Sequence, residues 1–276
     1  MRIDLHTHTT ASDGVLTPTE LVERAAREQV DVVGVTDHDT VTGVAEAQSA
    51  GGPLGVRVVA GIELTSRHDG RAVHVLGYFL DPLDEDLRRV LDAMQAERLD
   101  RVKRMVRRLN ELGYELTLDE VLRYATGAIV ARPHVARALV ARRYIGAVRD
   151  AFTPELIGDG GRADVSRTPI TPREAVDVIA AAGGAPVIAH PGLAHHLGTH
   201  QPIPDALIDE LAARGLRGLE VDHPDHDLQT RDRLRRLASR LGLVVTGGSD
   251  FHGETPRPIG YCTTTDESLA SLEAPA

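Results

Sequence analysis

The sequence contains no tryptophan, only three phenylalanines and a single cysteine, Cys262. A lone cysteine excludes an internal disulfide, and we expect a cytoplasmic protein. Aromatic residues make up 3% of the chain, so the core must be built from Val, Leu, Ile and Ala. The opening segment MRIDLHTH has no apolar signal core, and no stretch reaches the roughly 18 to 20 apolar residues that a membrane span requires.

Lysine is also scarce, because Lys103 is the only one and arginine supplies the rest of the basic side chains. The formal net charge of -10 argues against a broad electrostatic grip on long duplex nucleic acid. It is compatible with a small phosphorylated substrate held by local arginines or by metal ions. Nothing in the sequence indicates an obligate protein partner. The 276 residues suffice for one large domain, or for a domain that carries a smaller insertion.

Short apolar runs alternate with helical patterns over residues 1–82, which predicts an α/β fold with a parallel sheet and crossover helices. In the first helix, Thr17 is the expected N-cap, Pro18 the first helical residue and Glu20 the partner in a capping box. Residues 83–149 are strongly helical and charged, and we interpret them as an all-α insertion subdomain. The barrel pattern resumes over 150–276, with strands in APVIAHP, LRGLEVDHP and LVVTGGSDFHG.

Histidines and carboxylates mark nearly every predicted strand. They are His6, His8, Asp37, His38, Glu63, His74, His190, Glu220, His223, Asp250 and His252. A lone histidine at a strand end is usually just solvated or hydrogen-bonded, but the repetition is not expected by chance. The carboxyl ends of parallel barrel strands meet at one rim, so we expect these side chains to converge. Clustered titratable groups need charge compensation, which divalent cations supply.

The donor set contains imidazoles and carboxylates without thiolates. Such a set suits Zn²⁺, Mn²⁺ or Fe²⁺ and does not choose among them. There are too many candidate ligands for a single ion. We therefore expect two or three divalent metal ions, with Glu63 as the bridging carboxylate.

Six segments resemble, in order, the motifs of the PHP (polymerase and histidinol phosphatase) phosphoesterases: DLHTHTTASDG, GVTDHDT, AGIELT, HVLGY, IAHP and GGSDFHG. The resemblance covers nearly the whole chain. It is strongest to the stand-alone branch with a helical insertion and an ARPH motif. That branch includes nucleoside 3′,5′-bisphosphate phosphatases and 5′-to-3′ exoribonucleases. The resemblance implies a distorted (β/α)7 barrel, in residues 1–82 and 150–276, with a metal centre at its carboxyl rim.

The resemblance also implies roles for individual residues. His6, His8, Glu63 and Asp250 would hold one metal ion, and Glu63, His74 and His190 a second. Asp13, His38 and His252 would form a third position, or would contact substrate phosphate if that position were empty. Asp37 would orient one of the ligands.

Three further residues are candidates for contact with substrate. Arg132 and His134 belong to the ARPH motif, where Pro133 would begin a helix whose N-terminus favours an anion. The alternative for Arg132 is an exposed cap residue. His223 would contact substrate or protonate the leaving group. Asp222 stands where this branch often has an aromatic residue, which argues against base stacking there.

The predicted reaction is hydrolysis of nucleotide phosphomonoesters by a metal-activated hydroxide. The substrates would be 3′,5′-bisphosphonucleotides or 5′-phosphorylated short oligonucleotides. One alternative is a phosphatase for another small metabolite, such as histidinol phosphate. Another is a non-catalytic PHP module, which is disfavoured because all nine implied metal ligands are present.

Overall fold

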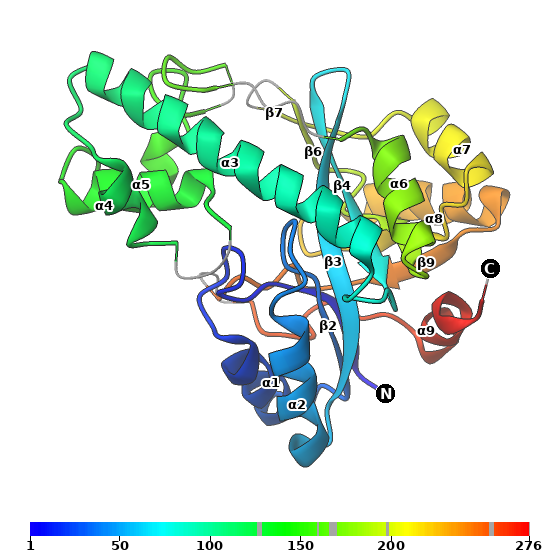
Figure 1. Cartoon of the computed structure of the whole chain (residues 1–276). Helices are drawn as coiled ribbons and strands as arrows, with labels where there is room; N and C mark the ends of the chain where they lie inside the picture. Colours follow the sequence, from blue (N-terminus) through cyan, green and yellow to red (C-terminus); the bar gives the residue numbers. More distant parts are fainter. Residues whose placement is uncertain (126–128, 159, 166–169, 197–198, 254–256, 276) are drawn as a thin grey trace.

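The computed structural model describes residues 1–125, 129–158, 160–165, 170–196, 199–253 and 257–275 (Figure 1). Seven strands form one sheet, in the order β1(Ile3–Thr7), β2(Val32–Val35), β3(Arg57–His68), β4(Arg71–Tyr78), β5(Ala185–Ile188), β8(Gly218–Asp222) and β9(Val244–Gly247). A single parallel bridge between Thr7 and Phe251 links the chain after β9 to the end of β1, so the sheet nearly closes on itself. The predicted α/β barrel is confirmed.

The expectation of a wholly parallel sheet is wrong for β4. This strand pairs antiparallel with β3 on one side and with β5 on the other. The cause is the two-residue turn between β3 and β4, where Asp69 and Gly70 have φ values of 47° and 77°. Two positive φ values in a two-residue loop make a tight hairpin, and only antiparallel strands can be joined in this way. Glu63 consequently lies in the middle of the long strand β3 rather than at its end.

Six helices pack around the barrel: α1(Pro18–Arg27), α2(Val44–Leu54), α6(Pro172–Ala181), α7(Asp205–Ala213), α8(Leu228–Leu241) and α9(Asp266–Glu273). The capping box predicted at the start of α1 is present, with Thr17 and Glu20 each accepting the other's backbone N–H. A small hairpin of β6(Ala194–His196) and β7(Thr199–Gln201) was not predicted. Within the described residues, no helix combines the length and the apolarity needed to cross a membrane.

A hydrophobic cluster supports the polar end of the barrel. It takes side chains from β1 to β5, including Val59 and Leu76, and from helix α9. Side chains two or four residues apart in a strand share a face, so Val59 lies on the face of Glu63 and Leu76 on the face of His74. The apolar cluster therefore continues along the same strand faces that carry these polar residues.

The helical part lies beside the barrel and consists of α3(Glu85–Glu111), α4(Leu118–Leu122), α5(Arg132–Ala141) and the 3₁₀ turn η1(Val148–Ala151) (Figure 1). Helix α3 reaches from the barrel into this part, and Gly113 follows it with a φ of 90°, as expected for a helix stop. The helical part has a hydrophobic cluster of its own, which runs from Val102 to Val165. This cluster extends past residue 149, the predicted end of the insertion.

Candidate metal centre

The nine side chains implied as metal ligands lie together at one end of the barrel. His6 and His74 come from β1 and β4, and Glu63 from β3. The rest follow strand ends: His8 and Asp13 after β1, His38 after β2, His190 after β5, and Asp250 and His252 after β9. His6, His8 and Glu63 are fully buried, and the others are partly accessible.

Glu63 is the centre of this group. Its Oε1 lies 2.9 Å from Nδ1 of His74 and 3.1 Å from Nε2 of His190. Its Oε2 lies 2.9 Å from Nδ1 of His38 and 3.4 Å from Nε2 of both His6 and His8. One carboxylate thus faces five imidazoles, which is the arrangement that a bridging ligand requires.

Possible ligand atoms gather in four overlapping groups, in each of which they lie within 4.8 Å of one another. The groups are His6, His8 and Asp250; His6, Glu63 and His190; His38, Glu63 and His74; and His8, Asp13, His38 and His252. The grouping differs from the one that the resemblance implies. His74 and His190 fall into separate groups, and His8 joins the third position.

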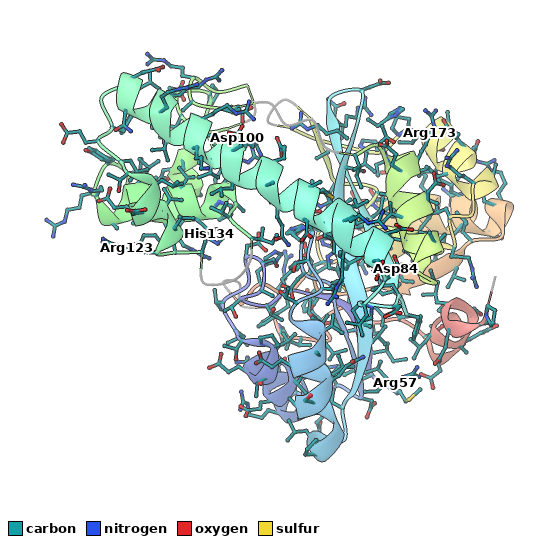
Figure 2. The ribbon with its side chains drawn as sticks, in the orientation of Figure 1. Arg57, Asp84, Asp100, Arg123, His134 and Arg173 are labelled. Atoms are coloured by element: carbon teal, nitrogen blue, oxygen red, sulfur yellow. The ribbon has the colours of Figure 1, made fainter. Side chains whose placement is uncertain are left out.

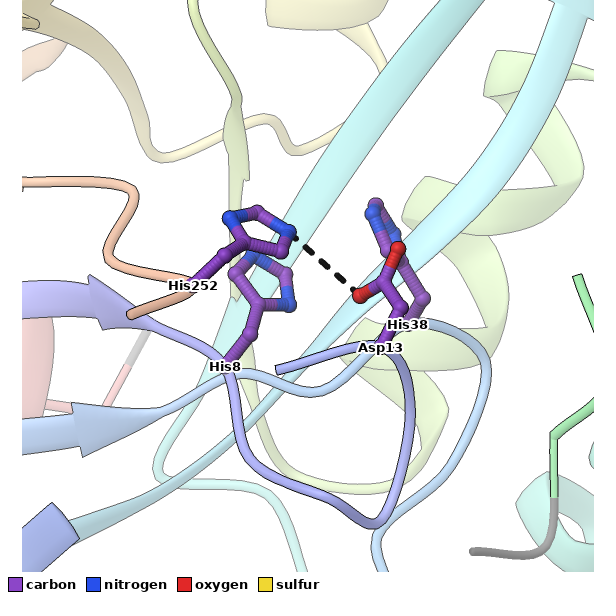
Figure 3. Close-up of side chains that lie close together, drawn as sticks. All are labelled: His8, Asp13, His38 and His252. Carbon is purple, nitrogen blue, oxygen red and sulfur yellow. Dashed lines mark ion pairs between the residues drawn. The ribbon is translucent and has the colours of Figure 1, made fainter. Parts of the chain in front are cut away.

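The third position is shown in Figure 3. Nε2 of His252 lies 3.4 Å from Oδ1 of Asp13, and the rings of His8 and His252 stack with centroids 4.1 Å apart. The loop that carries Asp13 folds tightly. As a result, a Cβ at Gly14 would lie 2.5 Å from the carbonyl oxygen of His8. Only glycine fits there without moving the backbone.

Asp37 holds the same loop. Its carboxylate accepts hydrogen bonds from the backbone N–H of Thr9 at 2.8 Å, the Thr9 hydroxyl at 2.7 Å and the Ser12 hydroxyl at 2.6 Å. These contacts fix the loop between His8 and Asp13. These three hydrogen bonds go to the loop and not to an imidazole, so the orienting effect of Asp37 would pass through the backbone.

The electrostatics of the group depend on how its carboxylates are compensated. Burial lowers the pKa of His252, but Asp13 and Asp250 outweigh burial and raise the pKa to about 10. Burial likewise opposes protonation of His38, yet Glu63 and Asp13 raise its pKa to about 9. Burial, followed by the neighbouring His252, lowers the pKa of His8 to about 4. Without a cation, the buried carboxylates therefore retain protons on neighbouring imidazoles.

The same residues fit divalent cations. Among the described residues, Nδ1 of His8 is buried without a hydrogen-bond partner. Oε2 of Glu63 is buried as well, and its contacts with His38, His6 and His8 are ion pairs without hydrogen-bond geometry. Neutral imidazole and carboxylate donors suit Zn²⁺, Mn²⁺ or Fe²⁺. A bound cation would displace the imidazole protons and compensate the carboxylates directly.

A cavity of about 210 Å³ lies between this centre and the helical part. Its barrel side includes Asp13, His38 and His74, and its helical side includes Arg98, Arg101, Arg132, Val102, Met105 and Phe152. Arg98 and Arg101 were not predicted as site residues. The helical pattern of the sequence indicates their burial, because both lie on the buried stripe of α3 between the apolar residues Met94 and Met105.

The ARPH residues lie at the start of α5. Arg132 lines the cavity, with its guanidinium 5.7 Å from the centre of the Phe152 ring. His134 is buried, and its Nδ1 accepts a hydrogen bond of 3.0 Å from the backbone N–H of Ala131. Burial is the main cause that lowers the pKa of His134 to about 4, so the ring is neutral and its proton is on Nε2.

His223 lies next to His190 and Asp250, neither of which lines this cavity. Its ring centroid is 5.3 Å from that of His190, and its Nε2 is 3.4 Å from Oδ2 of Asp250. Nδ1 accepts a hydrogen bond from the backbone N–H of Asp225, which places the ring proton on Nε2. The neighbouring Asp222 accepts two hydrogen bonds from Arg235, at 2.7 and 2.6 Å.

Comparison with known proteins agrees with this arrangement. The PHP domain family matches residues 4–159. The chain is 35% identical to a 3′,5′-nucleoside bisphosphate phosphatase of Chromobacterium violaceum, over 94% of this chain and 90% of the relative. It is 36% identical to a phosphoribosyl 1,2-cyclic phosphate 1,2-diphosphodiesterase of Eggerthella lenta, over 92% and 95%. It is 34% identical to a 5′-3′ exoribonuclease of Haemophilus influenzae, over 91% and 90%.

A crystal structure from Bifidobacterium adolescentis, described as a metal-dependent phosphoesterase, has the same fold. Its TM-score is 0.91 at 34% identity, and the match covers 98% of this chain and 94% of that one. The family match spans more than half of the chain, and the relatives are similar over nearly its full length. The resemblance read from the six motifs is therefore confirmed, and the chain belongs to the PHP domain family.

Proposed function

We propose that this protein is a metal-dependent phosphoesterase that hydrolyses phosphomonoesters of nucleotides. The substrates would be 3′,5′-bisphosphonucleotides or short oligonucleotides with a 5′-phosphate. The observation that carries the proposal is the position of Glu63 and its five imidazoles beside a cavity lined by arginines. Relatives named for a nucleoside bisphosphate and for RNA support the nucleotide class.

The nine clustered side chains would hold two or three divalent ions: His6, His8, Asp13, His38, Glu63, His74, His190, Asp250 and His252. When bound, such ions act as Lewis acids and lower the pKa of coordinated water. Manganese, zinc and iron all suit these donors. Asp37 keeps the loop of Asp13 in place through Thr9 and Ser12.

Arg132 and His134 would bind the phosphoryl group from the helical side. The guanidinium of Arg132 lines the cavity and can pair with two phosphoryl oxygens. The neutral His134 has its proton on Nε2, since Nδ1 caps the helix, and so it offers one further N–H donor. These groups would compensate the negative charge that the phosphoryl oxygens carry during the transfer.

His223 would supply the proton for the leaving alkoxide. The hydrogen bond from Asp225 to Nδ1 keeps the ring proton on Nε2, on the side of Asp250 and the metal centre. A donor that is held in one tautomer and aimed at the centre fits a general acid. This role is separate from that of the arginines, because His223 adjoins His190 and Asp250 and does not line the cavity.

A substrate panel with Mn²⁺-loaded protein tests the proposal. We expect phosphate release from adenosine 3′,5′-bisphosphate or from a 5′-phosphorylated short RNA, and none from histidinol phosphate. Release from histidinol phosphate alone would favour the small-metabolite phosphatase. If metal-loaded protein turned over no phosphoester, the protein would be a non-catalytic module and the proposal would be wrong.

A pair of arginine variants tests the phosphate contact. Arg132→Met should lower kcat/KM by about 10²- to 10³-fold, the usual effect of removing one donor to a developing oxyanion. Arg123→Met is the matched control. Arg123 is an exposed arginine of the same helical part, and Figure 2 shows it at the outer edge, farther from the barrel than His134. Equal activity of the two variants would remove Arg132 from the site.

A further inference from the structure

We propose that Glu220 is the positioning residue of the metal centre, which orients His6 and His190 together through its two carboxylate oxygens. Glu220 lies on β8 and is completely buried. Its Oε1 is 2.9 Å from Nδ1 of His6, and its Oε2 accepts a hydrogen bond of 2.8 Å from the backbone N–H of His190. The inference rests on the proposed function, in which both histidines are metal ligands.

The contact with His6 selects a tautomer. A carboxylate accepts hydrogen bonds only, so the ring proton of neutral His6 must be on Nδ1. Nε2 then presents its lone pair to the other side. There it lies 3.1 Å from Nε2 of His8, 3.3 Å from Asp250 and 3.4 Å from Glu63. A carboxylate behind the ring is the arrangement that fixes a metal-binding histidine.

The contact with His190 acts on the backbone. His190 has a φ of 28°, a region that residues other than glycine rarely occupy. A hydrogen bond to its N–H helps to hold this conformation, in which Nε2 of His190 lies 3.1 Å from Oε1 of Glu63. Glu220 therefore acts on two ligands that contact different oxygens of the bridging carboxylate, His6 at Oε2 and His190 at Oε1.

A purely structural explanation of Glu220 is weaker. A buried carboxylate costs more than an apolar side chain of similar size would at the same place. Glu220 is also not a member of any of the four ligand groups found among the described residues, so it is not itself a candidate metal ligand. Gly248 leaves space for the contact, since a Cβ there would lie 2.3 Å from Cβ of His6 and 3.0 Å from Oε1 of Glu220.

Glu220→Gln tests this role, because an amide has one acceptor oxygen where the carboxylate has two. The backbone N–H of His190 can only donate a hydrogen bond, so the oxygen of the new amide should face it. The amide NH₂ then faces Nδ1 of His6, which must become an acceptor. The proton moves to Nε2, and His6 loses the lone pair with which it would bind a metal ion.

The first measurement is metal binding to the whole protein, by titration with Zn²⁺ or Mn²⁺ in competition with a chelator. We expect the variant to bind one ion about 10- to 100-fold more weakly, the usual effect of removing such a partner. Binding by the group of Asp13, His38 and His252 should persist. Glu210→Gln is the control: this glutamate is partly exposed and paired with Arg173, and its replacement should leave metal affinity unchanged.

The second measurement is ¹⁵N NMR of the histidine rings in Zn²⁺-loaded protein, with the His6 signal assigned by its loss in His6→Gln. Wild-type His6 should show a proton on Nδ1, and this result decides the case even if Glu220→Gln does not fold. A proton on Nε2 in the wild type, or unchanged metal affinity and tautomer in a folded Glu220→Gln, would overturn the inference. If the wild type bound no metal ion, the proposed function itself would fail.

Discussion

Replacing Arg98 with methionine should destabilise the protein strongly, because it leaves a buried aspartate without its cation. Arg98 is on α3, and its Nε donates a hydrogen bond of 2.7 Å to Oδ2 of Asp39. Its Nη2 also contacts Asp39 and donates to the hydroxyl of Thr65 at 3.0 Å. The side chains of Arg98 and Asp39 are 10% and 0% exposed. The pair connects the helical part to the residue that follows His38.

The size of the effect follows from this burial. Removing one partner of a buried ion pair costs about 3–5 kcal/mol, since the remaining charge is neither solvated nor paired. The other oxygen of Asp39 still accepts a hydrogen bond of 2.6 Å from the backbone N–H of Thr65, so part of its compensation persists. We therefore expect a loss near the lower limit, about 3 kcal/mol.

Urea unfolding followed by circular dichroism measures the loss, and a double variant separates charge from packing. Arg98→Met combined with Asp39→Asn removes both charges, while asparagine tolerates the φ of 52° at this position. The double variant should be more stable than Arg98→Met alone. Arg173→Met, which breaks an exposed pair with Glu210, should leave the midpoint unchanged. If Arg98→Met also left the unfolding midpoint unchanged, the buried pair would not stabilise the contact between the helical part and the barrel.

Three further predictions concern single residues. His8→Ala should abolish activity through loss of metal, measured as metal content after gel filtration, whereas His68→Ala, at the end of β3 and outside the ligand groups, should retain both. The pKa of His134 is about 4 in the folded protein, below its usual 6.5. Between pH 6.5 and pH 4 the unfolded chain is therefore protonated at this residue while the folded protein is not. Wild-type stability should therefore fall by up to about 3 kcal/mol relative to His134→Gln as the pH drops from 7 to 4, and equal pH profiles in urea would contradict this. Burial raises the pKa of Cys262 to about 11, so iodoacetamide at pH 8 should alkylate it far more slowly in folded than in urea-unfolded protein, and equal rates would show that the thiol is accessible.

The features that the sequence predicts well are those set by local chemistry. The capping box of Thr17 and Glu20 and the stop of α3 at Gly113 depend on a few neighbouring residues, and both are present. The convergence of most candidate ligands was also predictable, because barrel topology brings strand ends to one rim. Asp13 was implied by the family resemblance alone, and Glu63 lies in the middle of β3 rather than at its end. The direction of β4 was not recognised, although the Asp69–Gly70 turn signals a hairpin.

The remaining features depend on contacts between distant segments. Glu220 and His6 are 214 residues apart in the chain, and only the folded sheet shows that one carboxylate serves both His6 and His190. Arg98 is similar, because a charged residue in a helix is usually solvated. Its burial follows from Asp39, which lies 59 residues earlier. Such pairs have no fixed sequence spacing, so the pattern of α3 can place Arg98 on the buried face but cannot show which residue it pairs with.

The arrangement of the cavity suggests where substrate choice is made. Relatives named for a nucleoside bisphosphate, a cyclic ribose phosphate and RNA are each similar to this chain over nine-tenths of its length. Because one fold can serve different substrates, the choice among them is made by side chains at the site. The barrel side of the cavity includes the candidate metal ligands Asp13, His38 and His74, which every phosphoester substrate would meet. The helical side carries Arg132, Met105 and Phe152, none of which is a candidate ligand, and Arg98 joins this side to Asp39. We therefore expect exchanges at these helical positions to change KM and substrate preference before they change metal binding.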